Sequence, residues 1–403
     1  MKRLLLLLVA VALLVPAAAN AQLTMQMSNG WTFSFAGNVN VFLVYEKEDD
    51  AGLTASPGAI VGNSSDGASR IRTGLLPAFA TFDAKGREGK TDLSVHFGFA
   101  PQIQCGPGNS VGGALHDCFG AQIDMRQVYL TIGGRWGSIL AGRELALYGR
   151  QNILTDQTLF GIGGTGGQLS GGTTLGRIGF GYIYPQFVPQ ITYTSKSGRP
   201  VQVSIGLFDP AENDGYAVIE LPRVEAEAVW SRKEWKAWVG GLLQNNSAPS
   251  PSTESATAVG LSGGARYTSK TFTVTGSGYY GKGLGTTLLF LNGTDGGSTA
   301  GGDNLRKSYG YIGQVTVTPR NSKATIAGSY GASILKASTL EEAAGGAPDF
   351  KTENGLISGG VYYQATKSLK VVGEINYAWS KEKVANPEKN SSFAPAFGFM
   401  LFF

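Results

Sequence analysis

The chain contains only two histidines, His96 and His116, and histidine is the side chain best suited to proton transfer near neutral pH. His96 shares one face of an alternating segment with Ser94 and Asp92, which are the residue types of a hydrolytic triad. Side chains two apart on a strand lie about 7 Å from one another, too far for relayed hydrogen bonds unless other strands contribute. The residues therefore favour a non-enzymatic protein, and we expect no cofactor and no metal.

Charged residues two apart offer a second kind of chemistry, the attraction and repulsion of ions. Arg70 and Arg72 share one face by alternation, as do Glu225 and Glu227. If such a face lines a water-filled passage, its charges cost little and bias which ions enter; otherwise each is an ordinary solvated residue. The glycine-rich run GIGGTGGQLSGG (161–172) lacks the spacing of a phosphate-binding loop, so we expect a folded or mobile loop there.

The beginning of the chain has the pattern of an export signal. Lys2 and Arg3 supply positive charge, 4–15 is an unbroken apolar run, and Ala19-Asn20-Ala21 is a small-x-small cleavage site. We expect residues 1–21 to be a cleaved signal peptide and residues 22–403 to form one exported domain. The apolar run is too short to span a bilayer as a helix, and no later segment has about 18 consecutive apolar residues, which excludes a helical membrane protein.

The two cysteines, Cys105 and Cys118, lie within CGPGNSVGGALHDC. In an exported protein we expect them to form a disulfide that closes a short loop, with a stabilisation of roughly 3 kcal/mol. The rival interpretation is a metal site that uses His116, Asp117 and Cys118, but it lacks a second cluster of ligands.

The composition narrows the class of protein further. The 33 basic and 29 acidic residues leave the chain nearly neutral, so nucleic-acid binding is not expected. Glycine accounts for 59 of 403 residues, about twice its usual share, without the repeat of collagen. Together with only 15% charged residues, this composition favours many strands, with glycine at crowded or bent positions.

Strand-like alternation recurs along the chain. From Trp31 to Tyr45 the odd positions are mostly large and apolar, while the even positions up to Asn40 are small or polar. Similar patterns occupy 93–99, 309–318, 357–366 and 369–380. The final segment carries Phe397, Phe399, Leu401 and Phe403 on one face. A soluble protein seldom exposes such a last strand, whereas a membrane β-barrel needs one.

Connections between these segments alternate strictly between short and long. Short turns are expected at 85–90, 133–137, 196–200, 232–234, 269–270, 319–323 and 366–368. Longer polar stretches are expected at 47–69, 101–121, 150–176, 209–221, 244–257, 282–307, 336–353 and 380–392. Seven turns and eight loops join sixteen strands, so the fold is predicted to be an all-β, transmembrane antiparallel barrel. The first and last strands must pair, because an open edge in hydrocarbon leaves costly unpaired backbone groups.

Aromatic residues near strand ends fit the two membrane boundaries: Trp31, Tyr45, Trp230, Trp235, Tyr309, Tyr377 and Trp379.

At this point the sequence resembles the general porins of Gram-negative bacteria, which are sixteen-stranded trimers of the outer membrane. The resemblance is carried by GWTFSFAGNVNVF (30–42), by RQVYLTIGGRWGSILAGRELALYGRQ (126–151) and by the terminal strand. In the family, an arginine-bearing strand turns through G-x-[FW]-G into a strand that ends in Gly-Arg, as 126–143 does here. The resemblance implies a homotrimer with short periplasmic turns, long extracellular loops and a third loop that folds into the lumen.

The resemblance also implies a constriction, formed by acids on the third loop and arginines on the wall. Asp156 is then the loop acid, Arg126 and Arg143 are wall bases, and Arg70 and Arg72 are weaker candidates. The sequence departs from the family in that Asp156 is the only carboxylate of 152–176 and the acidic-aromatic-Gly-Gly element is absent. Four wall arginines against one loop acid favour either a weak preference for anions or little selectivity.

The sequence therefore predicts a passive channel for small hydrophilic solutes and ions. A substrate-specific channel for a sugar or an anion is the alternative, but the assignable inward positions are mostly small and polar, with Tyr279 and Tyr362 isolated. A structural or adhesive barrel is a third class. Expected partners are outer-membrane lipid and lipopolysaccharide, to which the acidic residues Glu46, Glu48, Asp49 and Asp50 could be bridged by divalent cations, unless they form an ordinary solvated loop.

Overall fold

A computed structural model describes residues 23–49, 57–62, 66–104, 123–167, 172–211, 221–246, 255–294, 304–343, 351–382 and 389–403. The predicted signal peptide, the predicted disulfide between Cys105 and Cys118, and Asp50 lie outside the described residues.

The described residues form an all-β structure with two short α-helices and one 3₁₀ helix. The first nine strands are β1 (Leu23–Gln26), β2 (Thr32–Glu48), β3 (Gly67–Arg72), β4 (Phe79–Glu88), β5 (Thr91–Pro101), β6 (Ile123–Gly134), β7 (Gly137–Leu145), β8 (Phe187–Ser195) and β9 (Val201–Phe208). The others are β10 (Arg223–Arg232), β11 (Trp235–Asn246), β12 (Ala256–Thr268), β13 (Phe272–Lys282), β14 (Lys307–Val317), β15 (Ala324–Lys336), β16 (Lys351–Gln364), β17 (Leu369–Glu382) and β18 (Lys389–Phe402). The helices are α1 (Arg150–Thr155), the 3₁₀ helix η3 (Gln157–Phe160) and α2 (Thr339–Ala343).

The strands close into one antiparallel ring. Each strand from β4 to β18 pairs with the next, and β18 pairs with β2. β3 and β4 both pair with β2, at successive heights, so they are two parts of one strand position. The ring therefore has sixteen positions, as predicted. The short β1 was not predicted; it pairs with β2 at residues 32–35.

The terminal strand closes the ring, which confirms the predicted pairing of the first and last strands. Phe397, Phe399 and Leu401 of β18 lie opposite Leu43, Val41 and Val39 of β2. Beyond β18, the backbone of Phe403 exchanges two hydrogen bonds with that of Gly37, at 2.8 and 3.0 Å. No strand edge is left open at this position, which is what a barrel in hydrocarbon requires.

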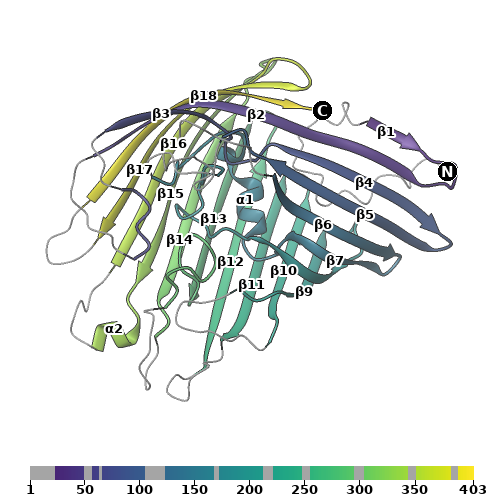
Figure 1. Ribbon diagram of the computed structural model, residues 1–403, viewed down its shortest axis with the longest axis horizontal. Helices are drawn as coiled ribbons and strands as arrows, with labels where there is room; N and C mark the ends of the chain where they lie inside the picture. Colours follow the sequence, from purple (N-terminus) through teal and green to yellow (C-terminus); the bar gives the residue numbers. More distant parts are fainter. Residues whose placement is uncertain are drawn as a thin grey trace, which may run out of the picture.

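All seven predicted short turns join the strands that they were expected to join. In the β4–β5 turn, Gly89 has a φ of 59°, a left-handed conformation that glycine adopts without strain. We call this end of the barrel the turn end and the opposite end the loop end. Figure 1 shows α2 at the loop end and the C-terminus at the other, while α1 lies within the ring of strands.

The alternation separates two faces, as predicted. On β2 the odd residues Val39, Leu43 and Tyr45 are exposed on the outside, whereas Asn38 and Asn40 are buried inside. The register carries this alternation around the ring, because residues directly opposite each other in a ladder lie on the same face. Neither α-helix in the described part of the chain is long and apolar enough to cross a lipid bilayer.

Candidate pore constriction

The loop between β7 and β8, residues 146–186, lies against the inner side of the barrel in its described parts, 146–167 and 172–186. Its apolar side chains Leu147, Ile162, Phe180 and Tyr182 are almost fully buried. They pack in clusters with inward residues of the wall, including Phe42 of β2. The loop therefore has a small hydrophobic core of its own within the lumen.

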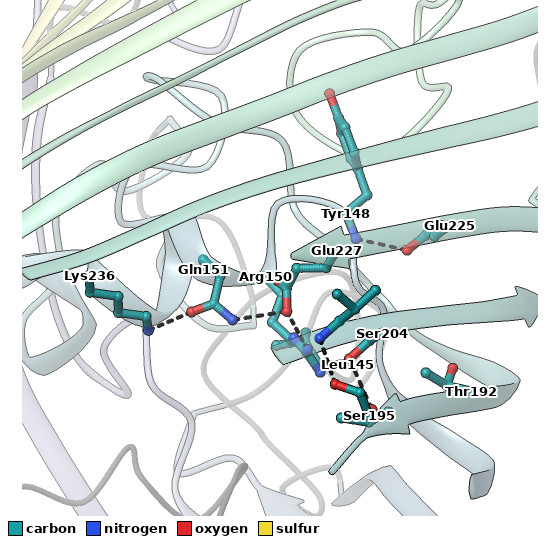
Figure 2. Close-up of polar contacts among 12 residues, drawn as sticks. Leu145, Tyr148, Arg150, Gln151, Thr192, Ser195, Ser204, Glu225, Glu227 and Lys236 are labelled. Atoms are coloured by element: carbon teal, nitrogen blue, oxygen red, sulfur yellow. Dashed lines mark hydrogen bonds and ion pairs between the residues drawn. The ribbon is translucent and has the colours of Figure 1, made fainter. Parts of the chain in front are cut away.

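The root of the 146–186 loop is held by two carboxylates of β10. The backbone N–H of Tyr148 donates to Glu225 Oε2 at 2.8 Å. Arg150 Nη2 lies 2.5 Å from Glu227 Oε1, and Gln151 Nε2 donates to the same oxygen at 3.2 Å. Figure 2 shows the side chains of Arg150 and Gln151 meeting at Glu227, and the backbone nitrogen of Tyr148 facing Glu225. Because both glutamates are buried, these charge-assisted bonds fix the loop where it leaves the wall.

The far part of the loop is held by carboxylates of β17 and β2. Glu374 Oε1 accepts from the backbone N–H of Ile162 at 3.1 Å and of Gly163 at 2.6 Å. Tyr362 Oη donates to the other oxygen of Glu374 at 2.7 Å. The Thr165 hydroxyl donates to Glu46. These acids therefore act as acceptors for the loop and do not face open water.

Basic and amide side chains fix the underside of α1. Arg266 Nη2 donates to the Thr155 carbonyl at 2.8 Å and Gln314 Nε2 donates to it at 3.0 Å. That carbonyl closes the helix and has no partner within it. Lys236 Nζ donates to Gln151 Oε1 at 2.6 Å, a contact visible in Figure 2.

One loop arginine is buried against the opposite wall. Arg177 is fully buried and donates from Nη1 to the Leu356 carbonyl at 3.0 Å, and also to the Ser329 hydroxyl. Burial lowers the pKa of Arg177, and the negative charge of Asp156 partly opposes this effect. The guanidinium therefore joins the loop to β15 and β16.

The predicted loop acid, Asp156, caps the helix η3. It accepts from the Thr158 backbone N–H at 2.9 Å, from the Thr158 hydroxyl at 2.7 Å and from the Tyr182 hydroxyl at 2.8 Å. Its carboxylate is 5% exposed. Among the described residues its hydrogen-bond partners lie in the loop itself and do not include the predicted wall arginines.

The predicted wall bases lie in different places. Arg126, beside a register shift of the β5–β6 ladder, contacts Asp124 at 2.7 Å and Tyr184 at 3.3 Å. Arg143 is exposed on the outer face, because Glu144 takes the inward position, and it donates to the Phe187 carbonyl at 2.7 Å. The expectation that Arg143 lines the wall is therefore corrected.

The weaker candidates on β3 do point inward. Arg70 lies opposite the buried Val44, and Arg72 lies opposite the buried Phe42. Arg72 is itself 1% exposed and donates from Nη2 to the Gly172 carbonyl at 2.8 Å. Arg72 thus holds the loop, whereas Arg70 keeps partial exposure.

The acidic run that could bridge to lipopolysaccharide is also corrected in part. Glu46 and Glu48 are 2% exposed on the inner face of β2, and Glu46 accepts from the hydroxyls of Thr165 and Ser392. Asp49 accepts from the Ser391 hydroxyl. Two of the four acids therefore face inward, because the even-numbered residues of β2 lie on its inner face.

A polar wall, of which the sequence analysis singled out His96 and Ser94 but not their partners on other strands, lies on β4, β5 and β6. His96 Nδ1 lies 3.1 Å from Asp83 Oδ1, and the His96 ring stacks on Tyr129 with centroids 4.7 Å apart. Lys85 lies 3.5 Å from the same Asp83 oxygen. The Ser94 hydroxyl lies 2.5 Å from that of Thr131, across the ladder. Alternation alone places Asp83 and Lys85 on one face, but only strand register brings His96 beside them.

Within the described ranges, no group of three or more histidine, cysteine or acidic side chains is arranged to hold a metal ion.

No protein-family model and no curated protein was found to match the sequence. Solved structures do match. The outer membrane channel DcaP of Acinetobacter baumannii is 14% identical over 94% of this chain and 99% of that one, with a TM-score of 0.65. The fold is that of a sixteen-stranded porin. The anion-selective porin from Comamonas acidovorans follows, with 11% identity over 93% and 100% of the two chains and a TM-score of 0.61.

OmpT of Vibrio cholerae also shares the porin fold, with 13% identity over 94% of this chain and 99% of that chain and a TM-score of 0.58. At such low identity the likeness establishes the fold and leaves the solute to be argued from the residues.

Proposed function

We propose that this protein is an outer-membrane channel through which small hydrophilic solutes and ions diffuse passively. The outer face supports a membrane location, because large apolar side chains such as Ile191, Leu261 and Ile375 are more than half exposed on it. Aromatic side chains gather near both strand ends, as Trp235 with Tyr267 and as Tyr377 with Trp379.

The single observation that carries the proposal is that the carboxylates that anchor the 146–186 loop all lie on one side of the barrel. Its carboxylate anchors lie on β2, β10 and β17, while the inward residues Thr81, Asp83, Gln127 and Tyr129 of β4 and β6 keep partial exposure. A loop held to one side of a sixteen-stranded barrel leaves the passage along the other side. Solutes would therefore pass between the loop and the β4–β6 wall.

A weak preference for anions is the finer proposal. Glu46, Glu225, Glu227 and Glu374 are buried as loop anchors, so their charges are compensated by donors. On the β4–β6 wall the Lys85 side chain is 38% exposed, against 17% for Asp83. The more accessible charge is thus positive, and an accessible wall charge biases which ions enter.

We also propose a homotrimer that reaches the outer membrane after cleavage of residues 1–21. The first experiment is single-channel recording of protein purified from outer membranes, in a planar bilayer under a salt gradient. Stable steps in groups of three, with a reversal potential on the anion side, are expected. Absence of conductance from a correctly folded barrel would refute the channel and leave a structural or adhesive barrel.

A further inference from the structure

A second loop also folds against the inner wall at the loop end. It joins β13 to β14, residues 283–306, of which 283–294 and 304–306 are described. Leu284, Leu289 and Phe290 are 0 to 3% exposed. They pack in one cluster with inward wall residues and with two residues of the 146–186 loop: Leu242, Ala258, Tyr279, Tyr148 and Ile183. The cluster buries apolar surface inside the barrel. Without the loop, this part of the inner wall would face water.

The two loops are joined through their backbones as well. The Tyr184 N–H donates to the Thr287 carbonyl at 2.9 Å, and Tyr184 forms a parallel bridge with Leu288. Backbone hydrogen bonds of this kind do not depend on side-chain rotamers, so they fix the position of one loop relative to the other. The 283–306 loop therefore lies directly against the loop that forms the proposed constriction.

The wall is shaped to receive this contact. A Cβ added at Gly260 of β12 would lie 2.8 Å from Leu284 Cδ1 and 2.9 Å from Tyr148 Cζ. Any larger residue at that inward position would force the side chains of Leu284 and Tyr148, one from each loop, to shift. Gly260 has a φ that any residue can adopt, so its conformational freedom is not the reason for a glycine here. The glycine is needed because it lets Leu284 and Tyr148 approach the strand backbone closely.

The base of the loop is held by hydrogen bonds and an ion pair. The Gly283 N–H donates to the Arg306 carbonyl at 2.9 Å, and the Arg306 N–H donates to the Gly293 carbonyl at 2.8 Å. The Arg306 side chain then pairs with Glu341 of α2 at 2.5 Å. Glu341 and Ser338 form a capping box, with bonds of 2.8 and 3.1 Å, that starts α2. An inward loop held at both strands and at α2 is suited to narrow a passage without closing it.

Phe290 joins the second loop to the root of the first. Its ring lies 5.9 Å from the Arg223 guanidinium, and Phe208 lies 5.7 Å from the same group. Arg223 pairs with Glu225 at 2.7 Å, and Glu225 accepts from the Tyr148 N–H. Both charged side chains are fully buried, so Phe290 helps to enclose the pair that fixes the constriction loop.

We propose that residues 283–294 and 304–306, the described parts of the loop between β13 and β14, form a second barrier that narrows the lumen together with the 146–186 loop and sets the size limit for hydrophilic solutes. The inference rests on the proposed channel function. Phe290 is the positioning residue, and the solutes admitted are small and compact, because the inner wall from β11 to β13 is covered by the apolar cluster.

The test compares the unaltered protein with three variants: replacement of residues 286–292 by two glycines, Phe290→Ala, and Leu291→Ala. Leu291 belongs to the same loop, but its side chain is 44% exposed, so its variant is the matched control. Single-channel conductance and liposome swelling with neutral sugars of increasing size are measured, and heat-modifiable migration verifies folding. We expect the loop replacement to raise conductance about twofold or more and to admit larger sugars, Phe290→Ala to act in the same direction, and Leu291→Ala to change neither.

Each outcome separates this inference from the channel itself. If the unaltered protein conducts and the folded loop replacement has the same conductance and size limit, the second barrier is refuted and the channel stands. If the unaltered protein is silent and the replacement conducts, the barrier is supported and an open pore is refuted. If neither folded protein conducts, both proposals fail. If the loop replacement and Phe290→Ala lower the thermal stability but leave the size limit unchanged, the loop only contributes packing, and the barrier is refuted.

Discussion

The inner wall has two unlike sides, although both come from the same alternation of residues. From β10 to β18 and on β2, inward side chains such as Glu225, Glu374 and Asn376 are buried by the 146–186 loop or by its neighbours. On β4 and β6, inward side chains such as Asp83 and Tyr129 stay partly exposed. The difference shows that the packing of the loops, rather than the strand pattern, decides where a charge can meet a solute.

The largest effect is expected where the anchoring is strongest. Glu374→Ala removes the acceptor of two loop N–H groups and of the Tyr362 hydroxyl, all in a buried site. Each buried donor left without a partner costs about 1–3 kcal/mol. We expect a lower unfolding temperature and strongly fluctuating single-channel currents.

The control for this variant is Glu353→Ala on the outer face of the neighbouring strand β16, where the side chain is 31% exposed. Glu374→Gln, which keeps one acceptor oxygen, should recover part of the lost stability. Equal behaviour of Glu374→Ala and Glu353→Ala would mean that the carboxylate does not hold the loop.

An intermediate effect is expected on the open side, where the charges differ in sign. Asp83→Asn should move the reversal potential toward anions, and Lys85→Gln should move it toward cations, because both side chains face the proposed passage. Lys236→Gln, on the anchored side beneath α1, should shift it less. Reversal potentials in a salt gradient measure all three variants. If Lys236→Gln shifts the reversal potential more than the other two variants do, the passage does not run along the β4–β6 wall.

A smaller, pH-dependent effect is expected at the base of the second loop. Burial raises the pKa of Glu341, but hydrogen bonds from Arg306 and Ser338 outweigh it and lower the pKa below its ordinary 4.5. The folded-state pKa lies below the unfolded one, so this stabilisation is present above that value and is lost as the pH falls through the folded pKa. Glu341→Gln should cost about 1 kcal/mol at pH 7 and remove this acid-dependent part.

Thermal unfolding of the unaltered protein and of Glu341→Gln, followed from pH 7 to pH 3, measures the difference. The two curves should converge at low pH. A constant difference across that range would show that the carboxylate charge contributes nothing.

The smallest effect is expected at Arg143. Its side chain lies on the outer face, so Arg143→Gln should leave the reversal potential unchanged. Arg70→Gln, which removes an inward charge on β3, should shift the potential toward cations. If the shift for Arg143→Gln is as large as that for Arg70→Gln, the Arg143 side chain faces the lumen and its assignment to the outer face is wrong.

Much of the fold could be predicted because its rules are local. The turn at 89–90 and the outward row from Val39 to Tyr45 both follow from period-two alternation interrupted by turn residues. The family resemblance assigned Arg143 to the lumen wall, and the local sequence could not correct this, because glycine on one side and Glu144 on the other leave its parity open to either face. The roles of Asp83 and Phe290 could not be predicted either, since their partners lie on other strands and loops.

By itself the sequence determined the sixteen strand positions of the ring, the turn end and the loop end of each, and the apolar outer face. These depend on the alternation of neighbouring residues and on the rule that backbone groups in hydrocarbon must be paired. Only the tertiary structure decided which inward charges hold a loop, as Glu374 does, and which remain accessible, as Lys85 does. That distinction depends on contacts between residues far apart in the chain, such as Gly163 with Glu374, which no local pattern encodes.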